Sequence, residues 1–436
     1  MPPPDALPRS GPSLRLEEFA ITNYRTFTTR TVIPFRSGTA EPDAIVTFHG
    51  NNGSGKSNAL VALDLFFNAL VKYLNSDESK SGKELTLDWA NESNPHEDFV
   101  ISFRDRPVNE AGPTEFEARF VDQRLGVLRV QFTPAGNSLR LRAEQGQVPS
   151  GSSMLEFQAI APERRDQLLT WIETPFGPGS YPCGILDSHR RGTLRPGSTM
   201  ELLDAAMSEA LFDLRTSLNL WDRAQWRVFT DQLQRFSTFQ GKEVSIDRLA
   251  AGTSPELTFE ERGKSILSLK ELSSGEQQLV RLCALITLRP YAIIGIEEPE
   301  LSLDIPNQVL FLEILRSQVQ SGIKDQIILE SHVPTFDSPS VIRFSRTASG
   351  PTQVTRAPGA NESDRAFAET AQAKGAKKQF VTRDGYTQLP NIMLKDLQFV
   401  DGGHLWFLKG KNAWEAWREE DLATLLADPE TDKDHE

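Results

Sequence analysis

The sequence predicts an α/β fold with a mixed central sheet, an antiparallel β patch beside it and a helical insertion. Three observations support this class. A glycine-rich loop at 50–57 joins an apolar run to a segment of helical periodicity, short β-type runs separated by turn residues occupy 99–142, and 155–240 changes to helical periodicity. At 436 residues the chain exceeds what one hydrophobic core usually holds, so we expect more than one lobe.

Composition narrows the class of protein. No apolar run approaches the roughly 18 residues of a membrane span, and the first segment, 1–13, lacks the apolar core of a signal peptide and predicts a disordered leader. We therefore expect a cytoplasmic protein without a membrane partner. Cys183 and Cys283 lie far apart and are interpreted as buried small hydrophobic residues. The net charge of −13 argues against a surface that attracts nucleic acid throughout, although a local basic face that contacts DNA stays open as an alternative.

Periodicity places the elements along the chain. Apolar residues alternate with polar ones in the predicted strands, and they recur at helical spacing in the predicted helices. The strands are expected at 14–24, 31–35, 44–48, 99–105, 115–122, 126–132, 138–144, 243–250, 256–262 and 265–272. The helices are expected at 57–74, 163–172, 200–218 and 222–236.

These elements suggest five segments. They are a leader at 1–13, an N-terminal lobe at 14–154 with the glycine-rich loop and the antiparallel patch, a helical insertion at 155–240, a C-terminal lobe at 241–347 and an extension at 348–436. In the extension, Trp414, Trp417, Leu422 and Leu425 would share one helical face. Such a helix would either dock a partner or pack on the chain's own lobe.

The loop from Gly50 to Ser57 reads GNNGSGKS and fits GxxxxGK[ST], the phosphate-binding P-loop. Glycines allow the left-handed turns that wrap backbone N–H groups around phosphate oxygens, and the helix that follows directs its positive end at the anion. Lys56 is expected to reach the phosphates and Ser57 a Mg²⁺ ion. The pattern also arises by chance in some chains of this length, so a nucleotide site needs support from other motifs in the sequence.

Two later stretches carry further chemistry. Ser273 lies in LSSGE at the start of a helix, where it is either an ordinary N-cap or a group that binds phosphate. The apolar run 292–296 ends in Glu297 and Glu298. Carboxylates at the C-terminal edge of a strand can hold Mg²⁺ and orient an attacking water. A second apolar run ends in Ser331 and His332.

In this order, the motifs resemble those of ABC-type ATPase heads of the SMC/RecF/OLD-like branch, in particular an OLD-like AAA family ATPase that lacks a Toprim nuclease domain. The resemblance covers 14–347. It implies a P-loop NTPase fold of the ABC ATPase-head type, with ATP and Mg²⁺ as ligands. The P-loop positions that it assigns to the nucleotide are Gly50, Asn52, Gly53, Ser54, Gly55, Lys56, Ser57 and Asn58.

The resemblance also implies roles outside the loop. Glu297 would hold Mg²⁺ together with Ser57, Glu298 would be the general base, and His332 would be the switch histidine that acts with Lys56 in catalysis. The remaining nucleotide contacts that it assigns are Arg25, in the opening strand, Ser273 and Gly275, in the signature, and Asp304, in the D-loop.

Three features depart from the family pattern. Glu297 is one methylene longer than the usual Asp, and in the signature Ser274 and Glu276 replace a Gly and a Gln. The glutamine of the Q-loop has two candidates, Gln123 and Gln131, either of which is equally a surface strand residue.

A P-loop and a signature on one chain face different directions in such a head, so the resemblance implies a homodimer, or a higher even-numbered oligomer, that sandwiches ATP. In OLD-like systems of bacterial anti-phage defence this switch serves a separate effector, a nuclease or a toxin. The alternative is a RecF- or SMC-like ATPase of DNA repair or recombination. A transporter energy subunit is a minor alternative, because transporters carry LSGGQ in place of LSSGE.

Overall fold

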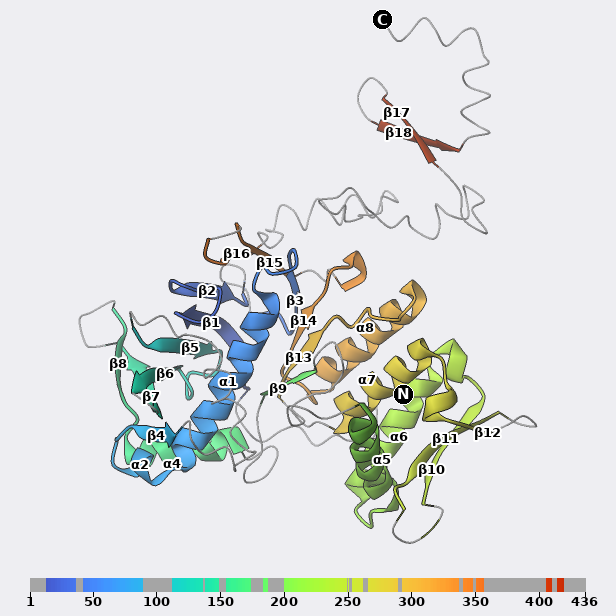
Figure 1. The fold of residues 1–436 in the computed structure, drawn as a ribbon, viewed down its shortest axis with the longest axis horizontal. Helices are drawn as coiled ribbons and strands as arrows, with labels where there is room; N and C mark the ends of the chain where they lie inside the picture. Colours follow the sequence, from blue (N-terminus) through green and yellow to red (C-terminus); the bar gives the residue numbers. More distant parts are fainter. Residues whose placement is uncertain are drawn as a thin grey trace, which may run out of the picture. The chain divides into compact units, whose positions relative to one another are not determined.

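The computed structural model describes the chain in two compact units, residues 1–359 and 360–436. The residues described are 13–36, 42–88, 112–135, 138–148, 154–173, 183–186, 200–248, 250, 253–261, 266–288, 292–336, 340–347, 350–356, 405–409 and 414–418. Figure 1 shows the elements of the first unit.

An antiparallel sheet forms one side of the first unit. Its strand order is β2-β1-β5-β6-β7-β4, and β8 pairs with β7. Apolar side chains alternate along β5 and β6, so every second residue is buried. The strands are β1 (Leu16–Thr22), β2 (Thr31–Pro34), β4 (Leu85–Asp88), β5 (Thr114–Phe120), β6 (Val127–Ala135), β7 (Ser138–Gln147) and β8 (Glu156–Ala159).

The central sheet is mixed and has the order β16-β15-β3-β14-β13-β9. Strands β15, β3, β14, β13 and β9 are parallel, and β16 is antiparallel to β15. β14 is buried along its whole length, and its three central residues are all apolar. The strands are β3 (Ile45–His49), β9 (Cys183–Leu186), β13 (Ile293–Glu297), β14 (Gln326–Glu330), β15 (Val341–Ser345) and β16 (Gln353–Arg356).

Helix α1 (Lys56–Asn75) lies between the two sheets, and its apolar residues join one hydrophobic cluster with both of them (Figure 1). A second cluster covers the opposite face of the central sheet. Besides the central strands, its members come from α5 (Met200–Thr216), α6 (Leu220–Gln234), α7 (Ser274–Leu288), α8 (Ile305–Gln320), β10 (Lys242–Asp247), β11 (Glu256–Glu261), η1 (Ser237–Phe239), η2 (Leu269–Glu271) and η3 (Pro334–Phe336). Strands β10 and β11 form a small sheet with β12 (Ile266–Ser268).

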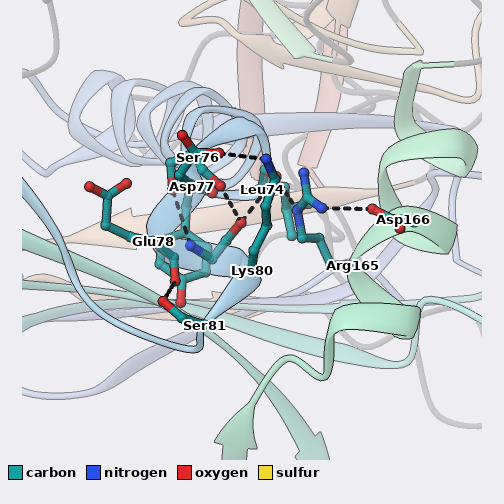
Figure 2. A network of polar contacts seen from close by, with 10 residues as sticks. Leu74, Ser76, Asp77, Glu78, Lys80, Ser81, Arg165 and Asp166 are labelled. Atoms are coloured by element: carbon teal, nitrogen blue, oxygen red, sulfur yellow. Dashed lines mark hydrogen bonds and ion pairs between the residues drawn. The ribbon is translucent and has the colours of Figure 1, made fainter.

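The C-terminal end of α1 is tied to α4 (Pro162–Glu173) by the polar contacts of Figure 2. Arg165 Nε donates a 2.7 Å hydrogen bond to the carbonyl of Leu74, and its Nη1 contacts Asp166. Ser76 begins the short helix α2 (Asp77–Lys80), where its Oγ accepts the N–H of Ser79. These contacts satisfy carbonyls and N–H groups that helix ends leave without partners, so α1 is fixed at the end remote from the P-loop.

The fold class predicted from the sequence is the one observed, an α/β P-loop architecture with a mixed central sheet and an antiparallel patch. Both cysteines are buried, as expected. The predicted strand at 99–105 and most of the leader lie outside the described residues. Helix α1 is long and apolar enough to cross a membrane by length and composition, but 67% of that window is buried inside the protein, as in a core helix.

Two expectations need correction. The segment 155–240 is not one helical insertion: β8 extends the antiparallel sheet, α4 packs on α1, and β9 forms the edge of the central sheet. Within this segment, the described helices α5 and α6 are the ones that pack with α7 into a helical layer. In the second unit, β17 (Leu405–Lys409) and β18 (Trp414–Arg418) pair as an antiparallel hairpin, so the helix expected through Trp414 and Trp417 is wrong there. Leu422 and Leu425 lie outside the described residues.

Candidate functional site

The P-loop connects β3 to α1 at the C-terminal edge of the central sheet. Gly53 and Gly55 have φ angles of +77° and +107°, which L side chains rarely adopt. A Cβ at Gly55 would also lie 2.6 Å from Thr352 Oγ1, and one at Gly50 would lie 2.2 Å from the carbonyl oxygen of Phe344. The glycines of the pattern are therefore required by backbone conformation and by close packing against β15 and the segment after it.

Lys56 is buried at the start of α1 and is folded over its own loop. Its Nζ donates hydrogen bonds to the carbonyls of Gly50, at 2.8 Å, and Asn51, at 3.3 Å, and lies 3.6 Å from Glu330 Oε1. Burial lowers the pKa of Lys56, and the charge of Glu330 partly offsets this effect. The ammonium group is thus held inside the loop that is expected to surround phosphate.

Strands β13 and β14 bring two carboxylates to the same edge of the sheet. Glu297 and Glu330 are paired in register across the parallel ladder. On both strands, alternate residues face α1: Ile293 and Ile328 belong to the same cluster as that helix, and a Cβ at Gly295 would contact Leu60. Since side chains alternate with period two, Glu297 and Glu330 also project from the face that α1 covers.

Glu330 is the site residue that the sequence motifs did not predict. Only 4% of it is exposed, and its Oε1 accepts a 2.9 Å hydrogen bond from Ser57 Oγ. Burial raises the pKa of Glu330, and Lys56 and Ser57 act in the opposite direction. The residue ends an apolar strand directly before Ser331 and His332, and its position at that edge was the signal available in the sequence.

Glu298 and His332, the predicted base and switch residues, face each other beside this group. His332 Nε2 lies 3.9 Å from Glu298 Oε1, and about a third of each side chain is exposed. Burial, followed by the charge of Lys56, lowers the pKa of His332. Glu298 has a φ of +43°, and its N–H donates to the carbonyl of Glu330 at 2.8 Å. A non-glycine residue held in this region is strained, which is common at functional sites.

A fourth carboxylate, Glu300, supports the histidine. Its Oε1 accepts the backbone N–H of His332 at 2.8 Å. Burial raises the pKa of Glu300, and the His332 N–H opposes that shift. Glu300 therefore fixes the backbone where β14 leaves the sheet. The family resemblance did not assign this residue.

Arg25 lies beside the first turn of α1, but its contact is with another predicted residue. Its Nη1 donates to Asn58 Oδ1 at 2.8 Å, and Asn58 in turn donates to Thr26 Oγ1 at 3.3 Å. Arg25 has a φ of +52°. The loop between β1 and β2 is thus held against the start of α1, and Arg25 is close to the P-loop side of the helix.

The signature stretch forms an N-cap at the start of α7. Ser273 Oγ accepts the N–H of Glu276 at 3.4 Å, and Glu276 Oε2 accepts the N–H of Ser273 at 3.0 Å, which is a capping box. Ser273 Oγ also donates to Glu276 Oε2 at 2.8 Å. Lys242 Nζ lies 3.0 Å from Glu276 Oε1. The ordinary N-cap interpretation is therefore correct for the isolated chain, and it leaves a phosphate contact in a dimer open.

Gly275 and Asp304 have structural explanations within one chain. A Cβ at Gly275 would lie 2.7 Å from the carbonyl oxygen of Ser302, so a side chain there would collide with the segment before α8. Asp304 is the N-cap of α8, because its Oδ1 accepts the N–H of Asn307 at 3.0 Å. Of the two Q-loop candidates, Gln131 donates to Glu115 across β5 and β6.

The chain thus gathers Lys56, Ser57, Glu297, Glu298 and His332 at one sheet edge, with Glu330 in addition. Ser273 and Gly275 lie at the start of α7, which packs on the face of the sheet opposite α1.

This donor set fits Mg²⁺ with a phosphate ligand. Mg²⁺ prefers oxygen ligands and commonly takes only one or two carboxylates in addition to phosphate oxygens. Ser57 and the two in-register carboxylates meet that description. In the loop, Ser54 Oγ is buried and has no hydrogen-bond partner among the described residues, so a polar group is available to a phosphate. No group of three His, Cys, Asp or Glu side chains that could hold a metal is found in the described part of the chain.

Two segments match families of ATPase domains. Residues 15–107 match the family described as AAA ATPase domain. Residues 208–338 match the family described as AAA domain, putative AbiEii toxin, Type IV TA system. The first match contains the P-loop, and the second contains the signature, the paired carboxylates and His332. Both matches agree with the P-loop fold and with the geometry of the site.

Solved structures of SMC heads have low similarity to the chain. An SMC head bound to the C-terminal winged-helix domain of ScpA has a TM-score of 0.47 at 16% identity and covers 78% of this chain and 97% of its own. The SMC head domain from Thermotoga maritima has a TM-score of 0.42 at 16% identity, and the match covers 79% of this chain and 99% of that domain. The Pyrococcus furiosus head with an extended coiled coil, bound to the C-terminal domain of ScpA, has a TM-score of 0.45 at 12% identity, and the match covers 82% of this chain and 99% of that one. No curated protein matches the sequence.

Proposed function

We propose that the chain is an ATP-hydrolysing switch of the ABC-head type, in which two copies associate around ATP and Mg²⁺. One observation carries the proposal. The P-loop, the paired carboxylates and His332 meet at one sheet edge, whereas Ser273 and Gly275 lie at the start of a helix on the other face of the sheet. A single copy therefore presents half of a site, and the signature of a second copy would complete it.

The residues of the half-site have complementary roles in this proposal. Lys56 exchanges its contacts with the loop carbonyls for contacts with phosphate oxygens. Glu298 orients water for attack, and its strained backbone holds the carboxylate near His332. Mg²⁺, when bound, neutralises charge that develops on the phosphates. Ser273 supplies a hydroxyl and a helix N-terminus to the nucleotide of the partner copy.

An exposed apolar stripe next to Asp304 supports association of two copies. Leu301, Ile305 and Val309 follow one another at a spacing of four residues and are 39%, 47% and 43% exposed. Ile305 and Val309 lie one turn apart on α8 and share one face, and Leu301 lies in the turn that precedes the helix. The stripe lies at the start of α8, beside the Ser302 carbonyl that packs on Gly275. It would supply apolar surface beside the signature in a dimer.

The test is Glu298→Gln. Because the amide keeps the size of the side chain but does not accept a proton, the variant should bind ATP, hydrolyse it at least about a hundredfold more slowly and accumulate as an ATP-bound dimer. Size-exclusion chromatography with light scattering, with and without ATP, measures the association. Lys56→Ala is the control, which should lose both ATP binding and the dimer. Normal hydrolysis by Glu298→Gln, or only monomers with ATP, would show that the assignment is wrong.

We further propose that this switch controls a separate effector, a nuclease or a toxin, in bacterial anti-phage defence. The second family match supports a toxin–antitoxin context, because its description names a putative toxin of such a system. The net charge of −13 disfavours general attraction to DNA. The alternative, a RecF- or SMC-like ATPase of DNA repair, predicts that added DNA stimulates ATP hydrolysis, whereas the effector role predicts no stimulation.

A further inference from the structure

Glu330 is a buried carboxylate in direct contact with the P-loop, and the family motifs assign it no role. Its Oε1 accepts the Ser57 hydroxyl at 2.9 Å and lies 3.6 Å from Lys56 Nζ. Both partners are residues that P-loops direct at the nucleotide and its cation. The carboxylate therefore occupies the space next to the two side chains that act first on Mg²⁺ and phosphate.

A purely structural role explains only part of this geometry. As the counter-charge of Lys56, Glu330 offsets the cost of burying an ammonium group. However, Oε2 of Glu330 is also buried and accepts no hydrogen bond from the described residues. A carboxylate oxygen removed from water without a donor is costly. A cation at this position would satisfy Oε2, whereas Lys56 and Ser57 contact Oε1.

The neighbouring strand supports the same interpretation. Glu297 is the register partner of Glu330 and projects from the same face of the sheet. Adjacent strands lie about 4.8 Å apart, so the two carboxylates end neighbouring strands, and Ser57 contacts one of them. Oxygen donors from a hydroxyl and two carboxylates are the set that hard divalent cations prefer.

We propose that Glu330 is a further residue of the cation site: its carboxylate, with the Ser57 hydroxyl, holds the divalent cation that accompanies the nucleotide. Without nucleotide, the same carboxylate neutralises Lys56. The inference rests on the proposed function, because the cation is the one that arrives with ATP. It assigns the metal site to two adjacent strands, β13 and β14, rather than to β13 alone.

The test is the effect of Mg²⁺ on nucleotide affinity in Glu330→Gln. The dissociation constant of a fluorescent ATP analogue is measured with Mg²⁺ and with EDTA, for the full chain. The gain from Mg²⁺ is the ratio of the dissociation constant in EDTA to that with Mg²⁺. Loss of the charge should reduce this ratio by at least about tenfold. Binding in EDTA should be unchanged or tighter, because a negative charge next to the phosphates is removed. That second measurement also shows that the variant is folded.

Glu300→Gln is the matched control. Glu300 is another carboxylate of this edge with a buried Oε2 that has no described hydrogen-bond partner, but its other oxygen contacts the His332 N–H rather than Ser57. Its replacement should leave the gain from Mg²⁺ unchanged. If Glu330→Gln changes the affinity equally with Mg²⁺ and with EDTA, Glu330 is only the charge partner of Lys56 and the inference is wrong.

A double-mutant cycle gives an independent readout. If Ser57 and Glu330 hold one cation, Ser57→Ala and Glu330→Gln should each reduce the gain from Mg²⁺, and the double variant should lose little more than either single variant. Additive losses would overturn the shared site. The outcomes also separate this inference from the proposed function, since a wild-type chain that binds no ATP contradicts the latter, whereas ATP binding with an unaltered Mg²⁺ gain in Glu330→Gln contradicts only the former.

Discussion

At the scale of single residues, two glycines of the loop are required for different reasons, one for its backbone conformation alone and the other also for the space around it. Gly53 has a φ of +77° and open space around a Cβ, whereas Gly55 has a φ of +107° and would meet Thr352 Oγ1 at 2.6 Å and Thr26 Oγ1 at 2.9 Å. Substitution of Gly53 thus tests backbone strain alone. Substitution of Gly55 adds a steric collision with two side chains, one of which, Thr352, donates to the carbonyl of Ser54 in the loop.

We expect Gly55→Ala to lower the free energy of unfolding more than Gly53→Ala does. The left-handed conformation costs about 1–2 kcal/mol for an L residue, and overpacking adds about 1–3 kcal/mol at Gly55. Urea denaturation of both variants measures the difference, and the same samples report ATP affinity. Equal destabilisation by the two substitutions would show that Thr352 and Thr26 move aside without cost.

At the scale of elements, sequence patterns predicted most of what positions the site. The apolar runs of β3, β13 and β14 and the helical spacing of α1 led to the P-loop and to Glu297 and Glu298, because a buried parallel sheet requires continuous apolar strands. Strand β9 was missed, since its four residues follow a proline, include a glycine and are too few to show periodicity. Glu330 was missed because its contact with Ser57 depends on strand register, which joins segments far apart in the sequence.

The N-terminus of α8 gives a prediction at this scale. Asp304 caps the helix, and the family resemblance implied that the same residue contacts the nucleotide from the D-loop. Asp304→Asn keeps an N-cap and should leave the unfolding free energy nearly unchanged, whereas Asp304→Ala should lower it by about 1 kcal/mol. Thermal unfolding measures this cost. If Asp304→Asn retains stability but loses ATP-dependent association, the carboxylate acts beyond its own helix; if both are retained, the cap is its whole role.

At the scale of the whole molecule, the candidate half-site belongs entirely to the first compact unit. Both hydrophobic clusters, the two large sheets and every residue of the half-site lie before Gly359. The second unit contributes the β17–β18 hairpin and none of the described contacts of the site. A chain that ends at Gly359 therefore keeps every described residue of the half-site.

We expect a chain that ends at Gly359 to bind ATP with the affinity of the full chain and to associate on addition of ATP, because it retains the P-loop, the carboxylates, the signature and the apolar stripe at α8.

If the segment after Gly359 docks the effector, the truncated chain should fail to bind that protein in a titration calorimetry experiment in which the full chain binds. Point substitution Lys56→Ala in the full chain is the complementary control, since it should lose ATP binding while the docking segment stays intact. Loss of ATP affinity in the truncated chain would instead show that residues after 359 contribute to the nucleotide site, and retained effector binding would place the docking surface within the first unit.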